Sequence, residues 1–431
     1  MKKGGCFSYI LVILISSIAA FIVSGALDNM AVEIPNLGDD TIEGILADME
    51  ERIQDKISRE TETEETETEE TEPAETEGIS VVVPDAPEEP ILYYDQLSAE
   101  EQKIYNVVYA GLVSGEKSFR FEGVPYDAYY AMCYRVICAI TYDHPELFWV
   151  QCGYRFTETH TLFEKNGDVD VEFIYYSYWE YSLDKKQKIQ ALENAANAVA
   201  AQASQYGTDY ERIQFVHDYL VENACYDFDG LNEYYKSMHD SACEYIFSAY
   251  GCLVNGKTVC SGYAKAFQMI MQKLGYNCLY VVGDAGEAHA WNCIFIEDEG
   301  YFLDVTWDDP DFEYDEPAYE YFCITSESLA KTHTLDQEFT IPECTAEELN
   351  YFLYNGYRMD TYDFRKVCEV VEKQKGQHII SMQFTNQDAI TEAYSELLTY
   401  GKCYDIPTLS DVADLQYSVN EDHYTIRFYL P

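Results

Sequence analysis

The chain has 431 residues, of which 47% are hydrophobic, so it is long enough for two or three domains with buried cores. Its formal net charge of -51 argues against binding to nucleic acid, whose phosphate backbone requires a basic surface, and against docking on anionic lipid headgroups. A cationic substrate or partner is compatible with this charge, but solubility alone also accounts for it.

The 14 cysteines are too few for a disulfide scaffold, and they show neither a CxxC pair nor the Cys/His spacing of a zinc site. We therefore expect no metal and no cofactor. Cys133 and Cys138 lie five positions apart on one predicted helix, where a bridge would be strained, and we interpret them as thiols. For the other cysteines the thiol and the disulfide state both stay open.

The N-terminal segment predicts a membrane helix. Lys2 and Lys3 precede Phe7–Leu27, an uncharged and mostly apolar run of 21 residues. A spanning helix needs about 20 residues, so the length favours a signal-anchor over a signal peptide. The small residues Ser24–Ala26 would suit a cleavage site, which keeps secretion as the alternative. We expect residues 1–27 to place a single-pass protein in the cell membrane with the rest of the chain extracellular.

Residues 28–90 predict a disordered acidic stalk. They carry 22 acidic and 3 basic side chains, and within them residues 60–77 are mostly glutamate and threonine. Such a tract repels itself and stays extended, and three prolines between 84 and 90 continue the spacer.

Residues 91–206 predict an N-terminal α+β domain. Ser98 and Glu101 form a capping box for a helix that runs to about Val113. No chemical motif stands out, and we expect this domain to pack on the next one and shape a cleft. The further expected elements are a strand over 118–124, a helix over 126–141, strands over 148–157 and 169–178 around Asn166–Asp168, and a helix over 185–205.

The stretch 251–308 carries the chemistry. Cys260 follows a glycine-containing approach and precedes apolar residues at the spacing of one buried helix face, which places it at a helix N-terminus. There the unpaired amides and the helix dipole favour a thiolate, and the same amides can receive an oxyanion. Gly275 is expected to end the helix at the C′ position.

Two strands, 278–282 and 289–296, and a returning strand, 301–306, are expected to follow. A turn of two residues would put Asp304 opposite Trp291, at about 7 Å from His289 between backbones. A turn of four residues would put it opposite Cys293, roughly 6 to 7 Å further along the strand. A working site requires the tighter register, for which a bulge at Gly300 is one route.

Three segments resemble the motifs of the transglutaminase-like superfamily, in the order of that family. They are VCSGYA at Val259–Ala264, HAWN at His289–Asn292 and LDVTWDD at Leu303–Asp309. The resemblance covers about residues 208–335, and Arg212–Asp227 resembles the leading helix of the family.

The resemblance implies a papain-like α+β fold, in which a nucleophile-bearing helix packs on an antiparallel sheet. It implies that Cys260 is the nucleophile, His289 the general base and then acid, and Asp304 the group that orients the imidazole. Family members often place an aromatic or amide oxyanion donor upstream, and Tyr226, 34 positions before Cys260, is a candidate.

The expected domain order closes with a catalytic domain over 207–335, a partly helical connection over 336–375 and a C-terminal α+β module over 376–431. The sequence of that module predicts a strand, a helix and a strand, with a final hairpin that turns at Asn420–Asp422. Because its sequence lies far from the three motifs, we expect it to bind or support and not to do chemistry.

The leading hypothesis is a cell-surface cysteine hydrolase or acyltransferase that acts on peptide, protein or cell-wall peptide amide bonds through a Cys260 acyl-enzyme. One alternative is an amine-accepting transglutaminase that cross-links proteins. The other is a non-catalytic adhesion or scaffold protein, which the long stalk and the flanking modules favour. The oligomeric state stays open.

Overall fold

The computed structural model describes residues 92–430 except 159–165, 181, 238–241 and 310–316. The predicted membrane segment and acidic stalk therefore lie outside the described residues. Within the described part, no helix is both long enough and apolar enough to cross a bilayer.

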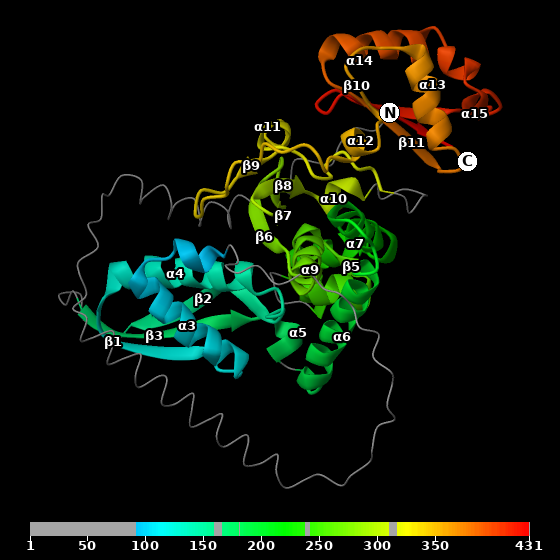
Figure 1. Ribbon diagram of the computed structural model, residues 1–431. Helices are drawn as coiled ribbons and strands as arrows, with labels where there is room; N and C mark the ends of the chain where they lie inside the picture. The colour runs from blue at the N-terminus through cyan, green and yellow to red at the C-terminus, as the bar shows by residue number, and fades with distance from the viewer. Residues whose placement is uncertain (1–91, 159–165, 181, 238–241, 310–316, 431) are drawn as a thin grey trace.

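The N-terminal part is a layer of two helices on a three-stranded antiparallel sheet with the order β1-β3-β2 (Figure 1). The helices pack on each other and enclose a core with the sheet. The elements are α3 (Ala99–Val113), α4 (Tyr126–Asp143), β1 (Ser118–Pro125), β2 (Val150–Glu158) and β3 (Asn166–Tyr175).

Sequence patterns predict most of this layer. Ser98 and Glu101 form the expected capping box, and the helix ends at Val113 as predicted. Asn166–Asp168, predicted to lie between two strands, instead begin β3 and pair with the end of β1. Tyr178, predicted to extend a strand, lies in the short helix α5 (Ser177–Glu180). At Asn166–Asp168 strand pairing overrode the local turn propensity, and at Tyr178 a short helix replaced the predicted strand.

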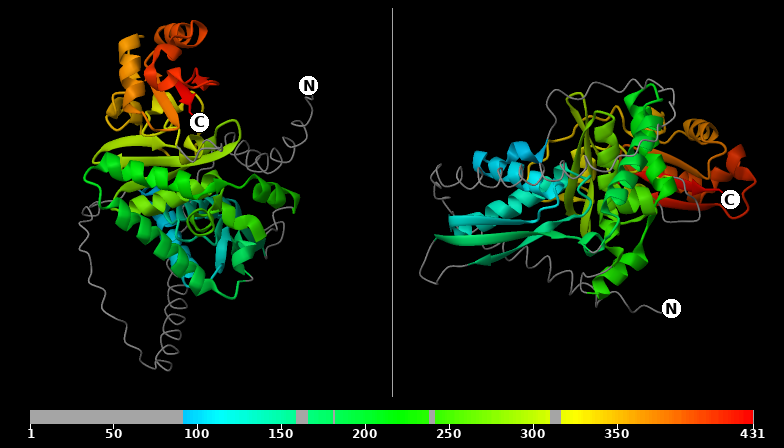
Figure 2. Two further views of the ribbon diagram at one scale, coloured as in Figure 1. Left: turned by 90° about the vertical axis from the view of Figure 1, so that its right-hand side faces the viewer. Right: turned by 90° about the horizontal axis from the view of Figure 1, so that it is seen from below.

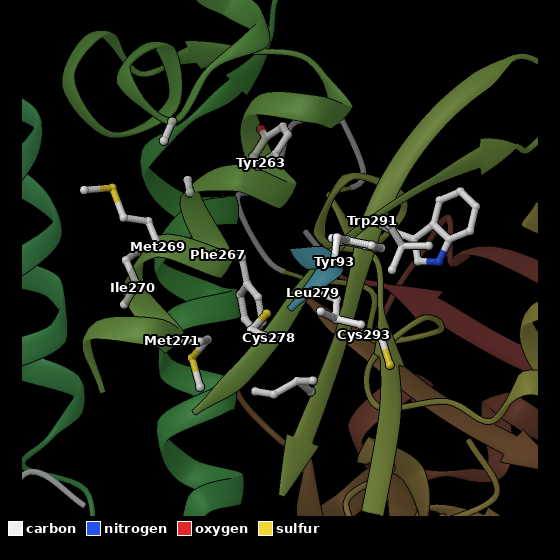
Figure 3. Packing of buried hydrophobic residues seen from close by; sticks show 14 of the residues in the cluster. Tyr93, Tyr263, Phe267, Met269, Ile270, Met271, Cys278, Leu279, Trp291 and Cys293 are labelled. Atoms are coloured by element: carbon white, nitrogen blue, oxygen red, sulfur yellow. The ribbon is translucent and has the colours of Figure 1, made fainter. Parts of the chain in front are cut away.

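In the central part, helix α9 packs on a four-stranded antiparallel sheet with the order β8-β7-β6-β9, and helices α6 and α7 pack on α9. In Figure 3, Phe267 of α9 lies between the helix and the sheet, whereas Trp291 of β7 points away from the helix. The elements are α6 (Lys185–Ala203), α7 (Asp209–Asn223), α9 (Cys260–Lys273), β6 (Asn277–Asp284), β7 (Ala288–Ile296), β8 (Glu299–Leu303) and β9 (Thr334–Leu335).

The register between β7 and β8 is the tighter of the two predicted pairings. Ile296 pairs with Glu299, so the turn contains two residues, and Asn292 pairs with Leu303. Gly300 pairs regularly with Phe295, so the bulge considered for it is absent. The next residue after β8 is Asp304, which the short turn brings to the His289 end of β7.

The C-terminal part, drawn in orange and red in Figure 2, has its own hydrophobic cluster, from Met359 to Phe428, around a sheet with the order β10-β11-β13-β12. The predicted strand–helix–strand pattern and the final hairpin are present. The cluster starts within the segment predicted as a connection. The elements are β10 (Arg358–Met359), α13 (Phe364–Lys373), β11 (Ile379–Phe384), α14 (Gln387–Ala393), α15 (Pro407–Ser410), β12 (Gln416–Asn420) and β13 (Thr425–Tyr429).

The C-terminal hairpin contacts the central part through a buried polar junction. Arg427 pairs with Glu320 at 2.5 Å, and the amide of Asn420 donates to the same carboxylate at 2.8 Å. The ring of His423 packs on Tyr321 at 4.6 Å. This module is distant from the three motifs in sequence but lies against the segment that follows them. Further short elements are α8 (Phe228–Lys236), α10 (Val305–Asp308), α11 (Ser326–Leu329), α12 (Tyr351–Tyr354), β4 (Cys225–Tyr226) and β5 (Lys257–Thr258).

Candidate active site

Cys260 is the first residue of α9, as the sequence predicts. The preceding N-cap residue is Val259, whose side chain has no oxygen to cap the helix amides. The first turn of α9 is therefore not closed by a side chain, although the N–H groups of Gly262 and Tyr263 donate to the carbonyl oxygen of Val259, and the helix dipole favours a negative charge beside Cys260. Gly275 has a φ of 86° and ends the helix at the expected C′ position.

Gly262 allows the nucleophile helix to start where it does. A Cβ at this position would lie 1.9 Å from Oγ1 of Thr258 and 2.7 Å from the carbonyl oxygen of Ile246. A side chain there would push α9 away from the segment that leads into it. The glycine of the VCSGYA motif is thus explained by a close backbone approach.

His289 lies on β7 and is 9% exposed. Its Nε2 donates to Oδ2 of Asp304 at 2.7 Å, because an ionised carboxylate can only accept. Cys260 lies close enough to this imidazole to help raise its pKa, and Nδ1 is the ring nitrogen not used by Asp304. The structure therefore brings together the three residues that the sequence singled out.

The two carboxylate oxygens of Asp304 accept hydrogen bonds from different groups. Oδ1 accepts the backbone N–H groups of Thr306 at 2.9 Å and Trp307 at 3.2 Å, so the residue caps the short helix α10. Oδ2 is left for His289. The cap holds the carboxylate in one orientation, and the imidazole follows it.

The electrostatics of this pair favour charge separation. Burial alone would lower the pKa of His289, but the charge and hydrogen bond of Asp304, with a contribution from Cys260, raise that pKa to about 10. Burial would raise the pKa of Asp304, but the two histidines on it hold that pKa well below its usual range. At neutral pH an imidazolium lies between the carboxylate and the cysteine.

The second histidine on Asp304 is His333, which the sequence analysis missed. Its Nε2 donates to the same Oδ2 at 3.2 Å, and its Nδ1 contacts Oγ1 of Thr332 at 2.8 Å. His333 reaches the site because β9 pairs with β6 at Gly283, where a Cβ would lie 2.0 Å from the carbonyl oxygen of Thr334. A two-residue strand has no periodicity, so no pattern in the sequence marked this histidine.

Aromatic rings form one side of the site. Trp291 is 1% exposed and stacks beside His289, with ring centroids 5.9 Å apart. Trp307 is 37% exposed and lies 4.6 Å from the ring of His333 and 5.8 Å from that of His289. Trp291 is thus a core residue, while Trp307 offers an exposed apolar face next to the imidazole.

Tyr226, the candidate oxyanion donor, lies on β4, where it pairs in parallel with Thr258. This pairing places it beside the segment that enters α9, two residues before Cys260. Its ring contacts Phe228 at 4.6 Å. The position is compatible with the predicted role, which stays a prediction.

The same histidines and carboxylate are the candidate metal ligands of the described residues. The ligand atoms of His289, Asp304 and His333 all lie within 4.8 Å of one another. Two of these distances are hydrogen bonds to one carboxylate oxygen. Hydrogen bonding therefore already accounts for the arrangement.

A cysteine at an uncapped helix start, an imidazole beside it and an oriented carboxylate define the thiol–imidazole–carboxylate class of site, which is suited to acyl transfer. Residues 196–304 match the model of the transglutaminase-like superfamily. The match contains all three residues.

Solved structures give a more distant comparison. The chain is 12% identical to a transglutaminase crystal structure, with a TM-score of 0.26 over 35% of this chain and 44% of the other. It is 12% identical to a candidate cysteine protease from Cytophaga hutchinsonii, with a TM-score of 0.22 over 36% of this chain and 62% of the other. The chain thus spans about half the length of these structures. No curated protein matches the chain.

Proposed function

We propose that the protein is a cysteine hydrolase or acyltransferase that acts on amide bonds of peptides, proteins or cell-wall peptides. The observation that carries the proposal is the 2.7 Å hydrogen bond between His289 and Asp304, with Cys260 on the other side of the imidazole. An imidazolium held by a carboxylate next to a cysteine favours the thiolate, which supports a reactive Cys260.

In the proposed reaction, the sulfur of Cys260 attacks the amide carbonyl carbon, and the carbonyl oxygen becomes an oxyanion beside the first amides of α9. His289 gives a proton to the leaving amine, the C–N bond breaks, and a thioester remains. Water then attacks the thioester, its proton passes to His289, and the product acid leaves as the thiol is restored. An amine in place of water would give a new amide.

The choice between water and an amine depends on which nucleophile reaches the thioester. Hydrolysis is the leading hypothesis, and protein cross-linking by an amine is the alternative. An adhesion or scaffold role would leave Cys260 without turnover. The Lys2–Lys3 and Phe7–Leu27 pattern supports a place at the cell surface, with the catalytic region outside the membrane or secreted after cleavage.

The test begins with limiting iodoacetamide on the full chain across pH 4 to 9. Trypsin releases Cys260 in the peptide 258–265, where it is the single cysteine, so its labelling is read directly. We expect Cys260 to react well below pH 8 and faster than an exposed reference thiol. A rate equal to that of the reference thiol would reject an activated nucleophile.

The second step distinguishes hydrolysis from transamidation. The full chain is incubated with peptide and cell-wall peptide mixtures, with and without a labelled primary amine, and the products are identified by mass. New carboxyl ends indicate hydrolysis, and amine-labelled glutamine side chains indicate transamidation. Activated Cys260 without either product would favour the scaffold role.

A further inference from the structure

A second pair of cysteines, remote from the triad, has no role in the proposed reaction. Cys138 lies on α4 and Cys152 on β2, and their sulfur atoms are 3.0 Å apart. Two sulfur atoms that share no bond do not ordinarily approach so closely, while a disulfide bond is about 2.05 Å long. A small shift of either side chain would bring them to bonding distance.

The two thiols lie in different surroundings. Cys138 is 1% exposed and is held inside the N-terminal core, whereas Cys152 is an exposed residue. The hydrogen bond from Cys138 lowers the pKa of Cys152, with further help from Thr141, and raises the pKa of Cys138. The exposed residue Cys152 is therefore assigned the attack on an external disulfide, and the core residue Cys138 is assigned the resolving step.

A lysine faces this pair from the nucleophile helix. Lys265 lies five positions after Cys260, and burial lowers its pKa to about 8. Its Nζ lies 5.3 Å from the ring centroid of Tyr280, and no carboxylate among the residues that the structure describes is within ion-pair distance. The charge that supports its protonated form is that of Cys152. Among the described residues, a cation without a carboxylate partner thus lies near Cys152.

We propose that Cys138 and Cys152 form a reversible disulfide by exchange with an external disulfide. The Cys152 thiolate attacks that disulfide, one of its sulfurs leaves as a thiolate, and a mixed disulfide forms on Cys152. Cys138 loses its proton to solvent and attacks Cys152 sulfur, which expels the second thiolate. Two protein thiols are oxidised, and one external disulfide is reduced to two thiols.

The bond would act on the helix that carries Cys260. α4 is already tied to α9, because the amide of Gln268 donates to the carbonyl oxygen of Tyr142 at 2.7 Å. Oxidation would link α4 to β2 and remove the anion beside Lys265. The proposal does not depend on turnover at Cys260, since the exchange uses other sulfur atoms.

Another pair gives an internal comparison. Cys293 and Cys344 have sulfur atoms 3.5 Å apart, and both residues are buried, at 0% and 1% exposed. Neither sulfur can meet an external disulfide without opening of the core. We therefore expect exchange at Cys138 and Cys152 under conditions that leave Cys293 and Cys344 as thiols.

The experiment equilibrates the full chain in glutathione buffers from fully reduced to fully oxidised, stops exchange with acid and alkylates the remaining thiols. Trypsin releases residues 136–155 as one peptide that holds Cys138 and Cys152 and no other cysteine. In oxidising buffer we expect this peptide to take up no alkyl group and to be two hydrogens lighter than the dithiol form, and dithiothreitol to reverse both changes. Two alkyl groups on the peptide at every ratio would overturn the proposal.

Variants test the order of the steps. In Cys138→Ser, glutathione should accumulate on Cys152, whereas in Cys152→Ser it should not accumulate on Cys138. Lys265→Met should slow alkylation of Cys152 at pH 7 by about tenfold, because a rise of about one unit in the pKa of the Cys152 thiol lowers its thiolate fraction by that factor. Lys273→Met is the matched control, because that lysine is on the same helix but pairs with Glu193. Equal rates in the two lysine variants, or glutathione on Cys138, would contradict the assigned order.

Discussion

Two buried histidine–aspartate pairs lie at opposite ends of α10, and they have different neighbours. Asp304 caps the start of this helix and holds His289, while Asp308 ends it and holds His217 of α7 at 3.3 Å. The two carboxylates are four positions apart in one motif. In both pairs an imidazole contacts a carboxylate that comes from the same short segment.

The pair formed by His217 and Asp308 is fully buried. His217 and Asp308 are both 0% exposed, and Nδ1 of His217 contacts Asp218 at 2.9 Å. Burial would lower the pKa of His217, but its two carboxylates raise that pKa to about 9. Burial outweighs the histidine at Asp308, whose pKa is raised. Both ring nitrogens face carboxylates, so this imidazolium is a structural tie between α7 and α10.

The difference lies in what the second ring nitrogen faces. In His217 it faces another carboxylate, and in His289 it faces the thiol of Cys260. A histidine that an aspartate keeps charged can take part in a reaction only when a nucleophile lies at its second ring nitrogen. The predictions that follow separate the structural pair from the reactive one.

The largest expected effect is on stability, from Asp308→Ala. Removing Asp308 leaves His217 with Asp218 alone and takes the buried acceptor from Nε2 of His217 and from the N–H of Tyr321, which costs about 3–5 kcal/mol of unfolding free energy. Chemical denaturation measures the loss, and the folded fraction should still alkylate Cys260 at the normal rate. Asp360→Ala, at an exposed site, is the control and should change stability by less than about 0.5 kcal/mol. Similar losses in the two variants would mean that the buried pair is not a tie.

His289→Ala should have the next largest effect, on reactivity. Without the imidazolium, alkylation of Cys260 at pH 6.5 should fall by about a hundredfold, toward the rate of an ordinary thiol. The peptide 258–265 reports the rate. His144→Ala is the matched control, because that histidine pairs with Glu146 on the N-terminal layer. An unchanged rate in His289→Ala would show that the pair does not activate the thiol.

The third prediction concerns pH. The folded pKa values of His217 and His289, about 9 and about 10, lie above the unfolded value of about 6.5. Their contribution to stability is complete below pH 6.5 and is lost as pH rises toward those values. Between pH 6.5 and 8 the unfolding free energy should therefore fall by about 1.4 kcal/mol per pH unit for each histidine. Above pH 8 the lowered pKa of Lys265 acts in the opposite direction.

Chemical denaturation at pH 6.5, 7.25 and 8 measures this slope. His217→Phe should reduce it by about half, because one of the two proton-binding groups is gone. A flat or rising stability over this range would contradict the charged state of both histidines. The acid side is separate: Asp304, with its depressed pKa, contributes stability at neutral pH that is lost as pH falls below about 4.

Much of this site could be predicted from the sequence because its information is local. Cys260 follows from the apolar period of α9, and the distance from His289 to Asp304 follows from the length of one hairpin turn. The capping box at Ser98 and the C′ residue Gly275 are local in the same way. Each depends on a few neighbouring residues whose geometry elementary rules define.

What could not be predicted depends on contacts between distant segments. The pairing of β9 with β6 that brings His333 to Asp304 leaves no period in the sequence. The strand start at Asn166 and the approach of Cys138 to Cys152 likewise depend on how the N-terminal layer assembles. A turn signal such as Asn-Gly is weaker than strand pairing and was overridden by it.

The smallest expected effect tests the residue that the sequence did not reveal. His333 touches neither Cys260 nor a reacting atom, so it acts as a positioning residue through Oδ2 of Asp304. His333→Phe removes one hydrogen bond of about 1 kcal/mol and should slow Cys260 alkylation by about threefold to tenfold, since the carboxylate is freer to turn from His289. His333→Gln keeps an N–H donor and should restore most of the rate, with the same dependence on pH as the unchanged protein. If both variants lose the rate equally, His333 serves packing against Trp307 and not the orientation of Asp304, and the reactive pair then depends on the α10 cap alone.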